Sequence, residues 1–292
     1  MHANGKTILI TGATSGIGKE AAVMLAREGA RIVIVGRDAA KTAAVLAEIK
    51  QRSGSDAATS MPCDFASQAS IRRLAEGFLE KHERLDVLIN NAGGVHARRE
   101  LTEDGIEATF AVNHLGYFLL TRLLLERLKA SAPARIVNVA SRAHYRGTLD
   151  LDDIGFEHGW RIMPAYARSK LANVLFTRAL AQRLSGSGVT VNAVHPGVVG
   201  THIWDHGAPP WARALFRIVF APVKRFYMRT PEDGAGPIVR LAIDADMEGQ
   251  SGLYFNREHV AEPSEAARDD ALAERLWLES ERLVALHQAS SR

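Results

Sequence analysis

A tyrosine and a lysine lie four residues apart in the segment Tyr166-Ala167-Arg168-Ser169-Lys170. In a helix, residues i and i+4 share one face, so the phenol and the ammonium could meet beside one substrate. An unperturbed phenol has a pKa of about 10, and it needs a neighbouring cation to favour its phenolate near neutral pH. The pair therefore predicts acid–base chemistry by Tyr166 assisted by Lys170. The alternative is an ordinary solvated helix face, where the same spacing is common.

A serine follows directly after the apolar run IVNVA at residues 136–140. Open α/β sheets bind their ligands outside the carboxyl ends of their strands, which is where Ser141 would lie. Its hydroxyl is therefore a candidate for holding a substrate oxygen. The alternative is a routine turn residue, because serine is common in turns.

A glycine-rich turn, TGATSGIG at residues 11–18, separates the first β-branched run from the first helical pattern. Gly12 permits a tight turn, Gly16 lets the backbone approach a pyrophosphate, and Gly18 allows the helix to pack closely on the strand. The helix N-terminus would then face the anion, although an ordinary connection between a strand and a helix is the alternative. The cofactor-binding positions predicted in this turn are Gly12, Thr14, Ser15, Gly16, Ile17 and Gly18.

The residues after the second predicted strand indicate which dinucleotide would bind. Gly36 stands where a carboxylate would hold the ribose of NAD, and Arg37 follows it. An arginine beside a missing carboxylate can bind the 2′-phosphate of NADP, and Lys19 is a second candidate cation. The sequence therefore predicts NADP(H) in preference to NAD(H). The alternative is that Arg37 is a solvated surface residue.

The elements that must position these residues alternate along the chain. β-Branched runs alternate with helical patterns as far as about Asn256, which is typical of a parallel sheet flanked by helices. The predicted fold class is α/β, a Rossmann-like doubly wound parallel sheet of about seven strands with helices on both faces. The predicted strands are Thr7–Thr11, Arg31–Val35, Ala57–Pro62, Val87–Asn90, Arg135–Val139, Thr190–Val194 and Gly252–Phe255. The predicted helices include Gly16–Glu28, Ala39–Arg52, Gln68–His82, Gly116–Lys129 and Ala165–Leu184.

The domain organisation follows from the absence of internal repeats, low-complexity tracts and Gly/Ser linkers. Residues 1–292 are therefore predicted to form a single NAD(P)-binding Rossmann domain. Residues 146–163 are expected over the site. Residues 202–230, rich in Trp, Phe, Pro and Arg, are interpreted as a substrate lid, with membrane contact and subunit packing as alternatives. Residues 263–292 are interpreted as a helical extension that closes the core or meets a second subunit.

Together with further motifs spread nearly end to end, these residues resemble the short-chain dehydrogenase/reductase family. The segments SKLANVLFT at 169–177 and HPGVV at 195–199 look like those of its retinol-dehydrogenase-type reductases, and the glycine spacing is similar to that of the compact branch. The resemblance implies an enzyme that interconverts alcohols and carbonyls with a nicotinamide cofactor. The further matching pieces are Cys63-Asp64-Phe65, Asn90-Asn91-Ala92-Gly93, Asn113 and Pro196-Gly197.

The resemblance also implies roles for the catalytic candidates. Tyr166 would exchange a proton with a substrate oxygen held by Ser141, and Lys170 would also hold the nicotinamide ribose. Asn113 would stabilise a helix kink and a water chain that leads to Lys170. These four residues, Asn113, Ser141, Tyr166 and Lys170, are the predicted catalytic set.

Further cofactor contacts are implied by the resemblance alone. Asp64 would bind the adenine amine, and Asn91 would line the adenosine side. Val199 and Thr201 would approach the nicotinamide. The remaining cofactor candidates are Arg37, Phe65, Ala92, Gly93, Tyr166, Lys170, Pro196 and Gly197.

Composition and charge exclude several other classes of protein. With 36 Lys and Arg against 33 Asp and Glu, the net charge of +3 is too small to indicate nucleic acid. The single cysteine, Cys63, permits no intramolecular disulfide. The sequence shows no signal segment, N-terminal anchor or apolar run of about 18 residues, so we expect a cytoplasmic protein, and membrane contact only as the lesser alternative. The predicted partner is a small alcohol or carbonyl, with a homo-oligomer left open.

Competing functions find less support in the residues. A non-catalytic NADP-binding regulator on the same fold would lose the reactive Tyr or Lys, and a hydrolase would need a G-x-S-x-G motif that is absent. His202 and His206 are spaced i, i+4 without a third ligand, so no metal site is predicted. His144 and His195 are interpreted as hydrogen-bonded histidines rather than substrate contacts, and Cys63 as a small buried side chain.

Overall fold

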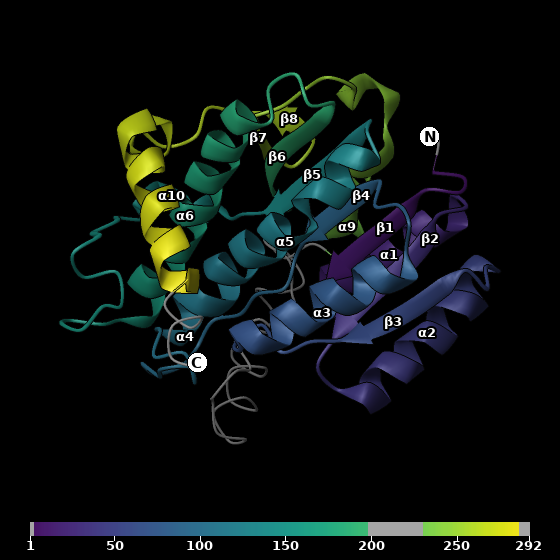
Figure 1. The fold of residues 1–292 in the computed structure, drawn as a ribbon, viewed down its shortest axis with the longest axis horizontal. Helices are drawn as coiled ribbons and strands as arrows, with labels where there is room; N and C mark the ends of the chain where they lie inside the picture. The colour runs from purple at the N-terminus through teal and green to yellow at the C-terminus, as the bar shows by residue number, and fades with distance from the viewer. Residues whose placement is uncertain (1–2, 198–229, 286–292) are drawn as a thin grey trace.

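The computed structural model describes residues 3–197 and 230–285. They include an eight-stranded sheet with the order β3-β2-β1-β4-β5-β6-β7-β8, in which every pair is parallel except β7 with β8 (Figure 1). The predicted doubly wound α/β class is confirmed, with β8 as an unpredicted strand, because two residues are too few to show an alternating pattern. The strands are β1 (Thr7–Thr11), β2 (Arg31–Gly36), β3 (Ala58–Pro62), β4 (Val87–Asn90), β5 (Ala134–Val139), β6 (Val189–His195), β7 (Tyr254–Asn256) and β8 (His259–Val260).

Helices cover both faces of the sheet, and each face has its own hydrophobic cluster (Figure 1). This arrangement explains why β1 and β4 are buried along their whole length and read as continuous apolar runs. One face carries α1 (Gly16–Arg27), α2 (Ala39–Ser53) and α9 (Pro231–Ile243). The other face carries α3 (Gln68–Lys81), α5 (Gly116–Ala130), α6 (Ile162–Arg183) and α10 (Asp270–Ala285), with the short α4 (Ala108–Phe110) before α5.

The sheet topology brings the candidate site together. Strands β1, β4, β5 and β6 are adjacent and parallel, so their carboxyl ends lie along one edge of the sheet. The loops that leave this edge begin at Gly12, Asn91, Ala140 and Pro196. Residues from four distant parts of the sequence therefore face one another across the edge where open α/β sheets bind ligands.

The helix that carries Asn113 contains a π-helical turn, Ala111–Leu115, between α4 and α5. A π turn adds a residue to the helical repeat and is frequent at functional sites. Together these elements form the continuous helix Ala108–Ala130, which is the one span among the described residues long and apolar enough to cross a membrane. Since 78% of its apolar window is buried inside the protein, its hydrophobicity is accounted for by the core.

The described part of the C-terminal extension, as far as residue 285, packs onto the core. Trp277 on α10 packs against Phe118 and Phe176, with ring centroids 4.9 and 5.9 Å apart. The helix begins at Asp270 rather than near residue 263. Helix α9 was not predicted, because Gly234, Gly236 and Pro237 are poor helix formers that obscure its pattern.

Candidate active site

The glycine turn has the geometry that the sequence predicts. Gly12 and Gly16 have φ values of +65° and +57°, a left-handed conformation that residues other than glycine rarely adopt. A Cβ added to Gly18 would lie 2.4 Å from Asn91 Nδ2 and 2.7 Å from the Gly12 carbonyl oxygen. Ser15, which precedes α1, makes no side-chain capping bond, and the first turn of α1 holds no acid. The N-terminus of α1 is therefore suited to bind the pyrophosphate of a dinucleotide.

Hydrogen bonds from the β1 and β4 ends hold this turn in place. Asn91 Nδ2 donates to the carbonyls of Thr11 and Gly12 at 2.8 and 3.1 Å. The Thr11 hydroxyl oxygen accepts from the backbone amides of Asn91 and Ala92 at 2.8 and 2.9 Å. Asn91 thus supports the cofactor turn with its side chain, a structural task that the resemblance did not imply. Thr11 is an anchor that the sequence analysis missed, although a hydroxyl at the end of a buried strand was a signal for it.

The glycine turn and the proton-transfer residues form one continuous site. A Cβ added to Gly12 would lie 2.6 Å from Ala92 Cα, so the turn and the β4 loop touch. A Cβ added to Gly93 would lie 3.0 Å from Asn113 Oδ1 and 3.7 Å from Lys170 Nζ. Residues 92 and 93 therefore lie between the dinucleotide turn and the catalytic candidates, and larger side chains there would fill the space between them.

Tyr166 and Ser141 meet at the carboxyl edge of the sheet. The Ser141 hydroxyl lowers the pKa of the Tyr166 phenol, while burial has the larger effect and raises that pKa overall. Tyr166 is only 9% exposed, on the first turns of α6. The structure therefore brings together the predicted proton donor and the predicted holder of the substrate oxygen.

Lys170 lies one helical turn after Tyr166, but its ammonium points elsewhere. Nζ donates to the Val139 carbonyl oxygen at 3.0 Å and lies 5.7 Å from the Tyr166 ring centroid. Burial lowers the pKa of Lys170 to about 7.

Asn113 fixes the π-helical turn beside Lys170. Its Oδ1 accepts from the Gly94 amide at 2.8 Å, and its Nδ2 donates to the Gly94 carbonyl at 2.9 Å and to Ser169 Oγ at 3.0 Å. The Ser169 hydroxyl in turn donates to the Tyr166 carbonyl at 2.8 Å. Asn113 therefore joins the kinked helix, the loop after β4 and α6, which agrees with the kink that the resemblance implied.

A buried polar network surrounds Lys170 that the sequence analysis missed. Asn173 Nδ2 donates to the Val139 carbonyl at 3.5 Å, and its Oδ1 lies 3.4 Å from His114 Nδ1. The other ring nitrogen of His114 lies 3.0 Å from Ser280 Oγ on α10. Burial lowers the pKa of His114 to about 3, so its ring is neutral. Polar residues on a helix do not reveal from the sequence that they face inward.

The two histidines at the strand ends are buried. Burial lowers the pKa of His195 to about 4, with smaller contributions from Arg142 and other neighbours. Both ring nitrogens of His144 are hydrogen-bonded to the backbone, which supports the interpretation of this residue as a hydrogen-bonded histidine. Cys63 is buried as expected, and burial raises the pKa of its thiol to about 12.

The end of β2 leaves no room for a carboxylate side chain. A Cβ added to Gly36 would lie 2.2 Å from Thr14 Cγ2 and 2.8 Å from Thr42 Oγ1. The next residue, Arg37, is exposed beside the glycine turn. Lys19, the second candidate cation, is paired with a carboxylate: Nζ donates to the two Glu48 carboxylate oxygens at 2.8 and 3.0 Å.

The other predicted cofactor contacts include exposed residues, buried residues and residues outside the described part of the chain. Asp64 is exposed after β3, and its Oδ1 accepts from the Ala66 amide at 3.0 Å. Phe65 is buried, and a Cβ added to Gly116 would lie 2.6 Å from its ring, so Phe65 supports the kinked helix. Pro196 and Gly197 follow β6 at the site edge. Val199, Thr201, His202, His206 and the predicted lid up to residue 229 lie outside the described residues.

The segment 146–161 is held beside the start of α6 by hydrogen bonds and a cation–π contact. Arg168 Nε donates to the Thr148 carbonyl at 3.2 Å, and its guanidinium lies 3.5 Å from the Phe156 ring centroid. Trp160 Nε1 donates to Glu107 Oε1 at 3.3 Å. The segment leads directly to Ile162 and Met163, large apolar side chains that are 38% and 46% exposed. An apolar rim therefore precedes Tyr166 by one turn of α6.

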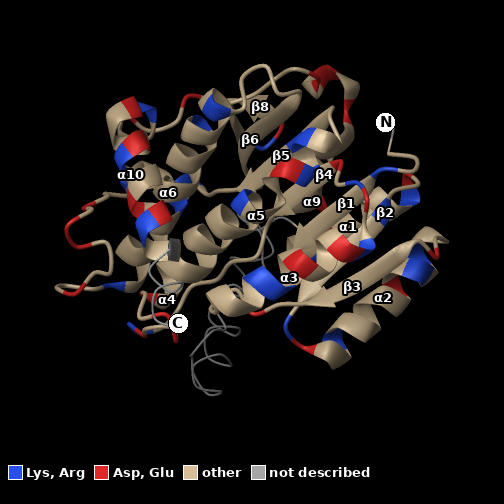
Figure 2. Ribbon diagram, in the orientation of Figure 1, with Lys and Arg blue, Asp and Glu red and all other residues tan. Residues whose placement is uncertain are grey.

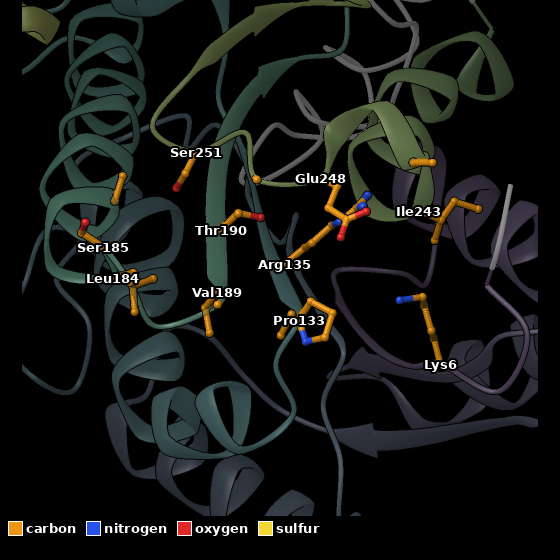
Figure 3. Close-up of a pocket in the computed structure, with 16 residues that line it drawn as sticks. Lys6, Pro133, Arg135, Leu184, Ser185, Val189, Thr190, Ile243, Glu248 and Ser251 are labelled. Atoms are coloured by element: carbon orange, nitrogen blue, oxygen red, sulfur yellow. The ribbon is translucent and has the colours of Figure 1, made fainter.

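A hollow of about 600 Å³ lies at the opposite edge of the sheet, where the strands begin (Figure 3). Its lining includes Lys6, Val189 and the side chains of Arg135 and Glu248, which point toward each other in Figure 3. Arg135 Nη1 is occupied by the carbonyls of Leu241 and Asp244 at 3.3 and 2.8 Å. This hollow is therefore separate from the candidate active site.

Charges on the described surface are mixed in sign. Both Arg and acidic residues lie along α10 (Figure 2), and Arg178 and Arg183 of α6 pair with Asp270 and Glu274 of α10. In residues 3–197 and 230–285, no group of three His, Cys, Asp or Glu side chains is arranged to hold a metal ion.

Comparisons with known proteins agree with this geometry. Residues 6–209 match the family described as short chain dehydrogenase. Human retinol dehydrogenase 13 is 44% identical over 293 residues, covering 99% of this chain and 87% of that protein. Dehydrogenase/reductase SDR family member 13 of Bos taurus is 45% identical over 286 residues, covering 97% and 74%.

Solved structures with the same fold are also similar in sequence. An uncharacterized protein from Mycobacterium paratuberculosis has a TM-score of 0.77 and 32% identity, covering 97% of this chain and 94% of that one. The Pseudomonas aeruginosa RhlG/NADP active-site complex has a TM-score of 0.68 and 27% identity, covering 94% and 100%.

Proposed function

Because this chain belongs to the short-chain dehydrogenase/reductase family and is an NAD(P)-dependent alcohol–carbonyl oxidoreductase, we propose that Tyr166 is its general acid and base, NADP(H) its preferred cofactor, and an apolar alcohol or carbonyl its substrate. The observation that carries the proposal is that Tyr166 and the buried Lys170, one helical turn apart on α6, meet the end of β5 just before Ser141: Lys170 Nζ donates to the Val139 carbonyl at 3.0 Å and lies 5.7 Å from the Tyr166 ring centroid.

The acid–base part follows from what the three side chains can do. In the reductive direction, Ser141 donates a hydrogen bond to the carbonyl oxygen of the substrate, and Tyr166 gives that oxygen its proton. Lys170, with a pKa of about 7, can exchange a proton near neutral pH beside Tyr166. The bound nicotinamide supplies the hydride. Oxidation of an alcohol uses the same residues in reverse, with Tyr166 as the base.

The cofactor preference is supported by the end of β2. The space over Gly36 excludes the carboxylate that would hold the NAD ribose, and Arg37 presents an exposed guanidinium next to it. The left-handed Gly12 and Gly16 and the uncapped N-terminus of α1 would hold the pyrophosphate. Two solved structures with this fold are complexes with NADP or NADPH, which agrees with the preference.

The apolar substrate is supported by the rim of the site. Ile162 and Met163 expose large apolar side chains at the start of the helix that carries Tyr166. Similar proteins are named for retinol, an apolar alcohol. A substrate that approaches Tyr166 past this rim would bury its apolar part there.

The test is a screen of paired substrates with both cofactors. Apolar and polar aldehydes, ketones and alcohols of matched size would be offered with NADPH or NADH, and the absorbance of the reduced nicotinamide followed. We expect turnover with NADPH and with the apolar members. Equal rates with NADH, or a preference for the polar members, would contradict the corresponding part of the proposal.

A further inference from the structure

His144 links the catalytic serine to the C-terminal part of the chain. Its Nδ1 lies 2.7 Å from the Ser141 carbonyl oxygen, and because a carbonyl only accepts, Nδ1 carries the hydrogen. The backbone amide of Ser264 donates to Nε2 at 3.2 Å, so Nε2 carries none. The ring is fully buried. A neutral imidazole of one defined tautomer therefore bridges Ser141 and Ser264.

Aromatic packing and a second hydrogen bond strengthen this contact. The His144 ring lies 4.1 Å from the Tyr145 ring and 4.7 Å from the Tyr254 ring, measured between centroids. The Tyr145 hydroxyl donates to the Glu262 carbonyl at 2.5 Å. The short helix Arg142–Arg146 and the segment 262–264 are thus joined at two points.

The turn fixed in this way begins at Ser141 itself. The Ser141 carbonyl accepts from both the backbone amide and the ring of His144, at 3.1 and 2.7 Å. The Ser141 hydroxyl oxygen accepts from the Ala143 amide at 3.2 Å, and the Ser141 hydroxyl acts on the Tyr166 phenol, whose pKa it lowers. The position of the Ser141 backbone therefore decides whether its hydroxyl can meet both Tyr166 and a substrate oxygen.

We propose that His144 is a positioning residue, which couples the C-terminal segment 262–264 to Ser141 and thereby holds the Ser141 hydroxyl against Tyr166. The proposal rests on the proposed roles of Ser141 and Tyr166 in the reaction. It makes residues 262–264, far from the catalytic residues in sequence, part of the support of the active site. It also requires both ring nitrogens of His144, one as donor and one as acceptor.

Two substitutions separate the two halves of the bridge. His144→Asn places an amide near the Nδ1 position and loses the acceptor for Ser264, whereas His144→Gln reaches the Nε2 position and loses the donor to Ser141. Ser264→Pro removes the backbone amide that donates to His144 Nε2, and Ser264→Ala keeps that amide. The Ser264 hydroxyl finds no hydrogen-bond partner in the described chain, so Ser264→Ala is the matched control for the proline variant. His82→Asn, at the opposite edge of the sheet, controls for the histidine substitution.

The first measurement does not depend on turnover. The chain would be labelled with ¹³C at Cζ of tyrosine, and the Tyr166 signal identified from its loss in Tyr166→Phe. Ser141→Ala gives the position of that signal when the Ser141 hydroxyl is absent. We expect His144→Asn, His144→Gln and Ser264→Pro to move the Tyr166 signal toward the Ser141→Ala position. Signals that stay at the wild-type position in folded His144 variants would overturn the proposal.

The second measurement is the pH profile of kcat for alcohol oxidation with NADP⁺. Because the Ser141 hydroxyl lowers the Tyr166 pKa, displacing it should move the alkaline rise of kcat to higher pH. We expect kcat to fall roughly tenfold, the effect of one lost hydrogen bond, with KM for NADPH unchanged in the reductive assay. Lower thermal stability with an unmoved profile and signal would mean a merely structural role and would overturn the proposal.

The two measurements keep this proposal distinct from the proposed function. If Ser141→Ala leaves turnover unchanged, the proposed role of Ser141 in the reaction is wrong, yet the Tyr166 signal still tests the coupling. If Ser141→Ala stops turnover while the His144 variants match the wild type in both measurements, the proposed function stands and the His144 proposal is wrong.

Discussion

The Ser141 hydroxyl lowers the pKa of the Tyr166 phenol, although Tyr166 lies on helix α6 and Ser141 follows strand β5. Burial acts in the opposite direction and raises that pKa overall. Lys170, in contrast, donates to the Val139 carbonyl. The acidity of the buried phenol therefore depends on how Ser141 is placed, and several measurable consequences follow from this part of the fold.

Removing the phenolic hydroxyl should stop proton transfer without emptying the cofactor site. We expect Tyr166→Phe to lower kcat by roughly 100- to 10,000-fold, the usual contribution of a general acid. Binding of NADPH, followed by its fluorescence, should stay within a fewfold of wild type. Retention of full turnover in Tyr166→Phe would show that another group moves the proton.

Neutralising Arg37 should change the cofactor preference. If its guanidinium binds the 2′-phosphate, Arg37→Gln should lower kcat/KM for NADPH relative to that for NADH by about tenfold or more, since a charge-assisted hydrogen bond is lost. Arg31→Gln is the matched control, because Arg31 is exposed at the opposite end of the same strand. An unchanged ratio of the two cofactors in Arg37→Gln would remove the basis for the preference.

A side chain at Gly18 should disrupt the dinucleotide turn. Its Cβ would lie 2.4 Å from Asn91 Nδ2 and 2.7 Å from the Gly12 carbonyl, so Gly18→Ala should displace the bonds that hold the turn. We expect weaker NADPH binding and a lower midpoint of thermal unfolding. Gly236→Ala on α9 meets nothing within 4 Å and should stabilise the protein by about 0.5–1 kcal/mol. If Gly18→Ala binds NADPH normally and is as stable as Gly236→Ala, the expected clash with Asn91 and Gly12 does not occur.

The buried Lys170 should make stability depend on pH. Its folded-state pKa of about 7 lies below its ordinary value of 10.5, so between these pH values the unfolded chain binds more protons. As pH rises through this range, Lys170 should therefore increase the free energy of unfolding by up to about 1.4 kcal/mol per pH unit. Below pH 7, its contribution should not change with pH.

Urea unfolding at a series of pH values checks this expectation. Lys170→Met removes the titrating group, so the difference in unfolding free energy between wild type and Lys170→Met should grow in favour of the wild type as pH rises. Lys129→Met, which alters a partly exposed lysine on α5, should show no such trend. A flat difference for Lys170→Met would mean that Lys170 keeps its charge in the folded protein.

The sequence by itself determined the parts of this protein that depend on local pattern. The alternation of buried strands and helices defined the doubly wound sheet, and the positions of Gly12, Gly16 and Gly18 predicted the dinucleotide turn. The i, i+4 spacing of Tyr166 and Lys170 placed both on one helix. These features can be predicted from the sequence because backbone conformation and side-chain periodicity depend on neighbouring residues.

Only the tertiary structure decided which polar groups meet. It paired Lys19 with Glu48, turned Asn91 back onto the glycine turn, and used His144 to connect Ser141 with Ser264. Each of these contacts joins residues from different elements. Hydrogen bonds between residues far apart in sequence produce no periodic pattern from which they could be predicted. Their geometry arises when the sheet is assembled, because strand order, rather than sequence neighbourhood, determines which strand ends and helix faces adjoin.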